Sequence, residues 1–534
     1  MIKNCHIDAL ASHNVFAVST ERTDREICIK VRKQKELTVE SLVLIVDFDQ
    51  PIVAWRGQDY QWNDNMSKEL FSNDYAPKIL VLKDGTHVLS SKNLGSWMYS
   101  PKKPNQLRWV LKHPRLAPVI SYDKVSNRRI RSTFAAQDYN LTLLFTKEPV
   151  PEFSRSKVPF SPIICFTDHC DFDTNDSLKK QLAFFKKHDL RVSKGFFLNH
   201  FSKRQNNSSY EFDAAIIDQF HKEGHELVYH SLTQSIRDDK SAFDEFFNFK
   251  APARFKTETW IDHGYQPYNF TKRQDAGIGD QKWADTLRAN DVKNLWTYLD
   301  SGTASQGIIN QLNPDHFTLA RIRSQKGLGF RFLFRTAMFF GGGEKMLMIY
   351  RKFAKSTKNV LYRKKLNAII PGVTSGFKAL WFLFLSLSSS KKRNTPFTNA
   401  QYAPFIFRHE VGSHTFMLFQ TVEVTDFENS FSPENLDLLC KENGAIIVHC
   451  YFSSPLKHQS GKLFNGDEIS SQNDKNFSYL HTLITEGKIW NPTVSQLIKQ
   501  HRHNLEIEYF FDEISNKIVT KNQAETAIRY IKYG

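Results

Sequence analysis

The chain has 534 residues, of which 40% are hydrophobic and 24% are charged. This composition is typical of a folded protein long enough for two or three domains, and it excludes an intrinsically disordered chain. The net charge of +16 comes from one segment, 321–394, which holds 17 Lys or Arg residues and one acid, Glu344. Outside this segment basic and acidic residues are equal in number, which argues against a nucleic-acid-binding protein.

The cysteines and the N-terminal residues indicate the cellular compartment in which we expect the protein. Six cysteines are spread along the chain without a Cys-x-x-Cys pair, which favours a reducing environment and argues against a cysteine-rich zinc site. The first residues contain no apolar segment of the kind found in signal peptides. We therefore expect a cytoplasmic protein.

Residues 1–150 are predicted to form a β-rich, sandwich-like accessory domain. Alternating apolar and polar residues indicate strands, and no long helical pattern intervenes. The predicted strands cover residues 27–32, 42–48, 78–82, 87–89 and 141–145. The proline-bearing stretch 148–159 is the predicted link to the next domain.

From residue 160 onward, predicted strands alternate with predicted helices. This alternation is typical of parallel β–α units and therefore of an α/β barrel. We place the first part of the barrel at 160–320 and the second part, with the C-terminal helices, at 396–534. The strands are predicted at 163–166, 192–198, 226–229, 260–264, 294–299, 404–407, 416–422 and 445–449, and the helices at 178–188, 212–224, 282–290, 433–441, 477–487 and 494–501.

The first barrel strand ends in the polar cluster Asp168, His169, Asp171 and Asp173. Carboxylates and an imidazole this close together repel one another unless a cation or a shared proton satisfies them. Residues 175 and 176 then offer an N-cap for the following helix. The alternative is an acidic turn whose only task is to cap that helix.

Other predicted strands also end in residues that can carry chemistry. Side chains at the carboxyl ends of barrel strands converge at one mouth, so we expect these residues to meet there. They are Asp168, His169, His230, Asp262, His263, Asp300, Arg408 and His449.

The basic segment 321–395 interrupts the barrel pattern. Its apolar runs, 330–340 and 379–387, are shorter than the ~20 residues that a membrane-spanning helix needs. Aromatic residues flanked by Lys and Arg instead favour contact with an anionic membrane surface. The alternative is an ordinary packed insertion with a solvated basic face.

Three motifs resemble those of the carbohydrate esterase family 4 polysaccharide deacetylases. The family's Thr-Phe-Asp-Asp motif corresponds to Phe-Thr-Asp-His at 166–169, and its Gly-His-Glu-Leu-x-x-His-Ser-x-x-His string to 224–234. A last apolar strand ending in histidine corresponds to 446–449. The resemblance covers about residues 162–500 and implies a distorted (β/α) barrel of the deacetylase type.

The resemblance also implies a reaction, the metal-dependent removal of an acetyl group from an N-acetylated sugar. By position, Asp168 corresponds to the family's general base and His449 to its general acid, and Arg408 or Asp262 would orient the base. The metal, zinc by preference, would be held by His230 with His169 or Asp171 and His263. Two family ligands are replaced here, one by His169 and the other by Gln234, so His263 is expected to compensate.

The expected substrate is a glycan in a surface polysaccharide or on a lipid carrier at the inner membrane face. Two alternatives stay open. The chain could be a glycan-binding protein at the membrane surface without activity. It could also be a glycoside hydrolase, a reaction that needs two carboxylates across the cleft, and Asp168 and Asp262 could be mistaken for such a pair.

Overall fold

The protein is described from a computed structural model. It describes residues 2–9, 15–122, 128–130, 133–204, 206–300, 305, 307, 310–325, 336, 349, 352–353, 355–360, 367, 369–454, 463–465, 468–521 and 526–534.

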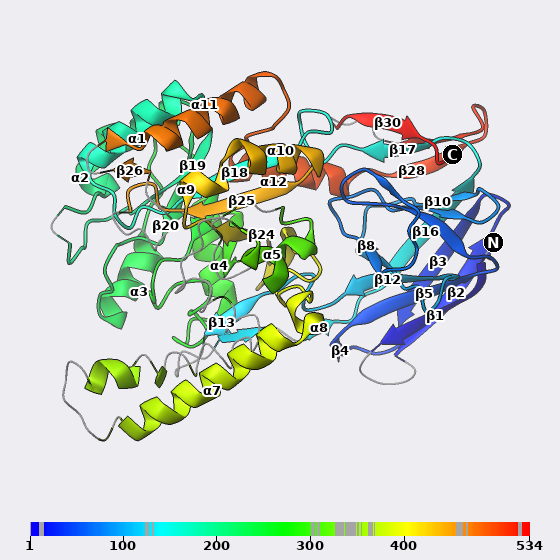
Figure 1. Cartoon of the computed structure of the whole chain (residues 1–534), viewed down its shortest axis with the longest axis horizontal. Helices are drawn as coiled ribbons and strands as arrows, with labels where there is room; N and C mark the ends of the chain where they lie inside the picture. Colours follow the sequence, from blue (N-terminus) through cyan, green and yellow to red (C-terminus); the bar gives the residue numbers. More distant parts are fainter. Residues whose placement is uncertain are drawn as a thin grey trace.

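Two antiparallel sheets form most of the N-terminal part, drawn in blue and cyan in Figure 1. The five-stranded sheet consists, in spatial order, of β1 (Ile2–Ala9), β5 (Leu42–Phe48), β12 (Gln106–Lys112), β11 (Ser96–Tyr99) and β8 (Leu70–Ser72). The seven-stranded sheet consists of β2 (Phe16–Arg22), β3 (Glu26–Lys33), β16 (Tyr139–Thr146), β10 (His87–Ser90), β9 (Ile79–Leu82), β6 (Ile52–Arg56) and β7 (Trp62–Asn63).

The two sheets share one hydrophobic core. Ile29 of β3, Leu44 of β5 and Trp109 of β12 are fully buried members of it. The predicted β-rich N-terminal region is therefore confirmed. Smaller strand pairs are β4 (Thr38–Val39) with β15 (Phe134–Ala135), β13 (Ile120–Tyr122) with β14 (Arg128–Ile130), β26 (Phe464–Asn465) with β27 (Glu468–Ile469), and β28 (Tyr509–Asp512) with β29 (Lys517–Thr520).

Seven parallel strands close into a barrel. Their order is β22, β21, β20, β19, β18, β25 and β24, and β22 pairs again with β24. The predicted α/β barrel is confirmed by this closure, whereas its assignment to the deacetylase type stays a prediction. The strands are β18 (Ile163–Asp168), β19 (Val192–Phe196), β20 (Glu226–His230), β21 (Thr259–Ile261), β22 (Asn294–Asp300), β24 (His414–Glu423) and β25 (Ala445–Cys450).

Helices pack around the barrel and bury its outer face. Phe184 and Phe185 of α1, Trp283 of α4 and Phe477 of α11 belong to the large core between barrel and helices. The helices are α1 (Asn175–Lys187), α2 (Tyr210–Lys222), α3 (Asp239–Asn248), α4 (Asp280–Ala289), η1 (Pro314–Phe317), α5 (Leu319–Arg323), α7 (Ile369–Ser388), α8 (Ser390–Arg393), α9 (Phe427–Ser430), α10 (Pro433–Lys441), α11 (Ser471–Thr485) and α12 (Val494–Leu505).

The N-cap of α1 is Thr174 and not the predicted Asn175 or Asp176. The hydroxyl of Thr174 accepts a hydrogen bond from the Ser177 N–H at 3.1 Å, and the Thr174 N–H donates to Ser177 Oγ at 2.9 Å. This reciprocal pair is a capping box, which satisfies two backbone donors at once.

The predicted strand 404–407 is not part of the parallel barrel. It corresponds to β23 (Ile406–Val411), which pairs antiparallel with β24 at the edge of the sheet. Only Gly412 and Ser413 join the two strands, and a parallel partner would need a far longer connection. Gly412 has φ +59°, which suits such a tight hairpin.

Much of the basic segment 321–395 lies outside the described residues, including the apolar run 330–340 apart from Thr336. Its main described element is α7, which runs along the edge of the molecule in Figure 1. Among the described helices, α7 included, none has the length and hydropathy needed to cross a bilayer.

A buried ion cluster ties the C-terminus of the chain to its N-terminal region. β17 (Val150–Phe153) pairs with β30 (Ile528–Ile531), next to the N-terminal sheets. Glu152 of β17 is fully buried and accepts two hydrogen bonds from Arg56, at 2.8 and 2.9 Å. Arg529 of β30 donates to the same carboxylate at 2.5 Å.

We expect Arg56→Met to lower the free energy of unfolding by about 3 kcal/mol, because it leaves a buried carboxylate without its main partner. Arg529→Met is the matched control: this side chain is 42% exposed, so its loss should cost about 1 kcal/mol or less. Urea unfolding followed by tryptophan fluorescence measures both. An equal decrease in the free energy of unfolding for the two variants would contradict the conclusion that Arg56 is the main partner of Glu152.

Candidate active site

The two-residue repeat of each barrel strand decides which side chains enter the lumen. In β18, Phe166 packs in the core between barrel and helices, whereas Cys165 belongs to the core inside the barrel. Since successive side chains of a strand point to opposite faces, Asp168 faces the helices and His169 faces the lumen.

The same repeat places three more histidines in the lumen. Each lies two residues after a member of the inner core, namely Val228, Ile261 and Ile447. The histidines are His230 at the end of β20, His263 just after β21 and His449 in β25. The predicted convergence of strand-end histidines therefore has a structural basis in four strands.

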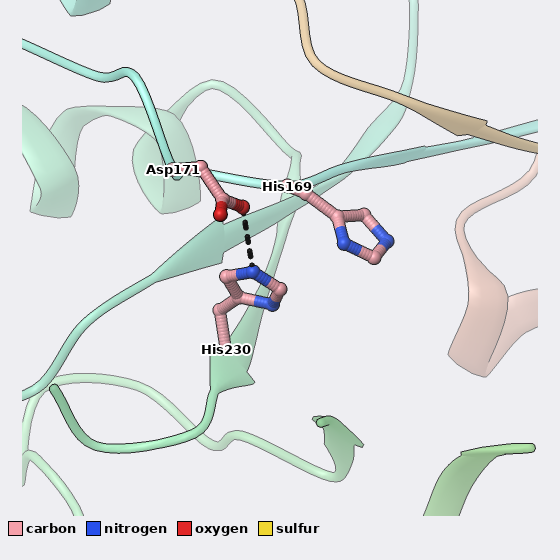
Figure 2. A group of neighbouring side chains, drawn as sticks. All are labelled: His169, Asp171 and His230. Carbon is pink, nitrogen blue, oxygen red and sulfur yellow. Dashed lines mark hydrogen bonds and ion pairs between the residues drawn. The ribbon is translucent and has the colours of Figure 1, made fainter. Parts of the chain in front are cut away.

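Asp171, in the loop after β18, contacts two of these imidazoles. Its Oδ2 lies 2.9 Å from His230 Nε2, and its Oδ1 lies 3.2 Å from His263 Nδ1. The two ring nitrogens are 3.1 Å apart. Figure 2 shows the contact between Asp171 and His230, with His169 beside them.

The tautomer of His263 follows from its second contact. His263 Nε2 lies 2.8 Å from the backbone carbonyl of Gln234. A carbonyl only accepts, so Nε2 must carry the proton and donate it. In the neutral ring Nδ1 then presents a lone pair to Asp171 and His230, which is the orientation of a metal-ligating histidine held by a backbone carbonyl.

His169 completes the cluster. Its ring packs edge-on against His230, with centroids 4.6 Å apart, and stacks on His449 at 4.0 Å. His169, Asp171 and His230 each offer a ligand atom, and these atoms lie within 4.8 Å of one another. His169 Nε2 is buried and has no hydrogen-bond partner among the described residues.

The protonation states suit cation binding. Burial, together with the neighbouring His449 and His230, holds the pKa of His169 well below its usual value. Burial also lowers the pKa of His230 to about 4, although Asp171 opposes this shift. Burial alone would favour the protonated acid of Asp171, but His263 and His230 outweigh it and hold the pKa of Asp171 well below its usual range. At neutral pH the two buried imidazoles therefore keep their lone pairs and the carboxylate its charge.

His169, Asp171 and His230 fit a divalent cation, and His263 contacts two of these three residues. Each imidazole nitrogen lies about 3 Å from one Asp171 oxygen, His230 Nε2 from Oδ2 and His263 Nδ1 from Oδ1, and the two nitrogens are 3.1 Å apart, so their lone pairs repel unless a proton or a cation stands between them. Imidazole nitrogens with one carboxylate form a donor set that zinc favours. The structure thus brings together all four predicted ligands.

His449 forms a second unit on the other side of His169. Its Nδ1 lies 3.3 and 3.4 Å from the two oxygens of Asp300, and Thr421 donates a hydrogen bond to Asp300 at 2.7 Å. His449 Nε2 is buried without a partner in the described part of the chain. Burial lowers the pKa of His449, but the Asp300 charge outweighs it and raises that pKa above its usual value.

Asp168 belongs to a separate ionic cluster on the helix side of β18. Lys194 of β19 bridges Asp168 and Asp173, and the Phe452 N–H donates to the other oxygen of Asp168 at 2.8 Å. Burial raises the pKa of Asp168 to about 7 even beside Lys194, whose single charge serves two carboxylates. Since both of its oxygens are engaged, this placement does not support the predicted role of Asp168 as the general base.

The other two predicted catalytic residues lie away from the histidines. Asp262 points outward, where its oxygens accept hydrogen bonds from the N–H groups of Phe270 and Thr271 at 2.8 and 3.0 Å. This buried carboxylate organises the loop after β21. Arg408 is exposed in β23, opposite Met417, which in turn pairs with Asn294 at the start of β22, so Arg408 lies far from the carboxyl ends of the barrel strands.

Asp300 and Trp296 are partners of the catalytic candidates whose roles are not among those predicted from the sequence. Asp300 was recognised as a strand end, but the pairing of β22 with β24, which places it beside His449, leaves no local signal. Trp296 packs edge-on against His169 and His449 at 4.9 and 5.0 Å and donates to Thr421 at 2.9 Å. Its position four residues before Asp300, on the same strand face, was the available signal.

Comparison with known proteins gives no family. No protein-family model matches the chain, and no curated protein matches it. Among solved structures, an α-galactosidase from Thermus thermophilus matches 74% of this chain and 98% of its own, with 9% identity and a TM-score of 0.24.

Two further neighbours are a dextranase from Flavobacterium johnsoniae and the cycloalternan-forming enzyme from Listeria monocytogenes. The dextranase match covers 96% of this chain and 73% of that one, at 8% identity and a TM-score of 0.25. The Listeria match covers 77% and 58%, at 8% identity and a TM-score of 0.21. At these TM-scores the likeness assigns neither a family nor an activity to this chain.

We expect the wild type to bind about one zinc ion and His230→Ala to bind it at least ~100-fold more weakly, because the variant loses a ligand nitrogen. Metal analysis after desalting and a zinc titration measure this. His188→Ala is the control: His188 is also buried and paired with an aspartate, Asp474, at 3.0 Å, but it ends α1 instead of a barrel strand. Full zinc content in His230→Ala would show that the site is elsewhere.

Proposed function

We propose that the chain is a metal-dependent hydrolase that removes the acetyl group from an N-acetylated sugar, in a surface polysaccharide or a lipid-linked glycan. One observation supports this most: a cation-binding cluster and a His–Asp pair lie side by side in the lumen, joined by the stacked rings of His169 and His449. Amide hydrolysis needs both a Lewis acid for the carbonyl and a proton carrier for the amine.

The cation, with zinc the preferred ion, would be held by His169, Asp171, His230 and His263. When bound, it would polarise the amide carbonyl and lower the pKa of water towards ~7. The chain's own contribution is to hold the donors in place. The Gln234 carbonyl fixes the ring of His263, and Phe197 packs against the rings of both His230 and His263, at 5.4 and 4.9 Å.

His449 is the proton carrier in this proposal. Asp300 accepts a hydrogen bond from the Nδ1–H of His449, so the Nε2 of the neutral ring presents its lone pair to the lumen. Nε2 takes the proton that the attacking water loses and then returns it to the nitrogen of the departing amine. Asp300 stabilises the imidazolium that exists between these steps. His449 thereby takes over the base role that the resemblance gave to Asp168.

Tyrosines at the mouth favour a sugar as the substrate. The ring of Tyr122, from the N-terminal part of the chain, lies edge-on to Tyr298 of β22 and to Tyr265, at 5.9 and 6.2 Å. Tyr265 is 46% exposed. An aromatic face with a polar hydroxyl can pack against a sugar ring. By contrast, Trp260 is fully buried and Trp296 nearly so, so both act as packing residues.

A glycoside hydrolase is the alternative for this lumen, whose described carboxylates are Asp171, Asp300 and Glu423, the last residue of β24. That reaction needs one carboxyl group with a raised pKa as acid and a second carboxylate across the cleft. Asp171 has a lowered pKa and Asp300 is engaged by His449 and Thr421. Asp168 and Asp262 have their oxygens engaged on the helix side of the barrel.

We expect the zinc-loaded protein to release acetate from N-acetylglucosamine oligomers. His449→Ala should reduce the rate ~100- to 10,000-fold while retaining zinc, because it removes the proton carrier and no ligand. Acetate and new reducing ends are measured in the same reaction. The control variant His188→Ala should release acetate at the wild-type rate.

Other outcomes of this assay separate the alternatives. New reducing ends without acetate would indicate a glycoside hydrolase, and oligomer binding without either product would indicate a glycan-binding protein. Asp168→Asn tests the role that the resemblance implies for Asp168: a loss of rate as large as that of His449→Ala, with the fold intact, would make Asp168 the base.

We expect Asp300→Asn to move the acidic limb of the pH profile of kcat/KM to lower pH. Asp300 raises the pKa of His449, so without its charge His449 stays neutral, and able to accept a proton, at lower pH. Thr421→Val is the control, because it removes a hydrogen bond to Asp300 but keeps the charge. If the acidic limb of the Asp300→Asn profile stays at the wild-type pH, His449 is not the group whose protonation causes that limb.

A further inference from the structure

Helix α7 presents large apolar side chains to solvent. Ile370 is 75% exposed, Phe377 71% and Phe384 61%. Val373, Leu380 and Trp381 are each more than half exposed as well. Soluble proteins rarely expose so many contiguous apolar groups unless the surface binds something.

These six side chains lie on one face of the helix. At about 100° per residue they fall within an arc of about 100°. The opposite face carries Ser375 and Ala379, which are both buried. The helix therefore rests on the protein through small residues and directs its apolar face outward.

Glycines allow that close contact on the inner side. A Cβ atom at Gly372 would lie 3.2 Å from Ser356 Cβ, and one at Gly376 would lie 3.2 Å from a ring carbon of Phe353. Residues 352–353 and 355–360 are helical and pack there. The apolar arc is thus the face that the rest of the described chain leaves uncovered.

The charge around this face selects the partner. Lys352, Lys355, Lys358 and Lys378 are all exposed on α7 or on the helical segment packed against it. The whole segment 321–394 has 17 basic residues and a single acid. A surface that binds it must therefore be negatively charged as well as able to accept aromatic side chains.

We propose that α7 docks in the interface of an anionic lipid bilayer, lying in its plane. An apolar face with Trp and Phe, beside a cationic flank, is the pattern of a helix that inserts at the level of the lipid headgroups. Pro371 and Lys378 interrupt the apolar sequence of α7, and the described residues contain no helix that could cross a membrane. A complementary protein surface is the competing occupant. The proposal does not rest on the deacetylase activity.

Cosedimentation of the full chain with vesicles tests the proposal. We expect binding to phosphatidylcholine mixed with phosphatidylglycerol, little binding to phosphatidylcholine alone, and release by high salt, because screening removes the attraction to the lysines. Phe377→Ala with Phe384→Ala should weaken binding at least tenfold. Lys355→Glu with Lys358→Glu should weaken it only for the anionic vesicles.

The matched control is Phe212→Ala with Ile514→Ala, which removes two side chains that are as exposed, 66% and 97%, on other parts of the surface. This variant should bind like the wild type. The proposal would be overturned if the wild type did not bind the anionic vesicles at low salt. It would also be overturned if the control variant lost as much vesicle binding as Phe377→Ala with Phe384→Ala. A third outcome would make a protein surface the occupant. In that case the wild type associates with itself and does not bind vesicles, and of the variants only Phe377→Ala with Phe384→Ala abolishes the self-association.

Discussion

The alternation of side chains along parallel strands is the constraint on which the site depends. In a closed barrel every strand residue faces either the lumen or the helices, and neighbours in sequence take opposite faces. Asp168 and His169 are adjacent, yet one joins an ionic cluster with Lys194 and the other joins the lumen histidines. Polar residues that are neighbours in the sequence therefore lie in two different environments.

The two environments support each other. The Asp168–Lys194–Asp173 cluster fixes both ends of the loop that carries Asp171, since Asp168 precedes this loop and Asp173 follows Asp171 by two residues. Gly195 keeps the adjacent strand close, because a Cβ atom there would lie 2.7 Å from the Asp168 carbonyl oxygen and 3.5 Å from His230 Cβ. A buried ion cluster of this kind is weak support for stability but can hold one geometry, and here that geometry aims Asp171 at His230 and His263.

The sequence was enough to predict the barrel and the convergence of histidines, because both follow from local patterns. Strand–helix alternation fixes the parallel barrel, and a histidine at the end of a strand must lie near the mouth. The faces of Asp168 and Asp262 could also have been found by counting along their strands from Phe166 and Trp260, which belong to the outer core. Strand-end residues are therefore not equivalent, because only those in phase with the inner core face the lumen.

Other features depend on contacts between distant segments. Asp300 meets His449 only because β22 closes the barrel onto β24, a pairing that no local pattern encodes. Lys194 lies in the middle of an ordinary strand and gains its role from two carboxylates 21 and 26 residues away. The antiparallel edge strand β23 did have a local signal, the Gly412-Ser413 turn between two apolar runs, and this turn outweighs the parallel pattern around it.

Position 234 departs from the motif that the sequence resembles, and its contacts suggest a physical interpretation of that departure. In the deacetylase motif that the sequence resembles, this position carries a metal-binding histidine, and here it is Gln234. Its side chain accepts hydrogen bonds from Ser202 and Ser235, and its backbone carbonyl accepts a hydrogen bond from His263 Nε2–H. Any residue at position 234 has a backbone carbonyl, whatever its side chain. The loop can therefore hold the ring of His263, from the neighbouring strand, although it has no histidine at position 234. The imidazole would then approach the cation from β21, beside His230, and the site would still have the same kind of donor atom.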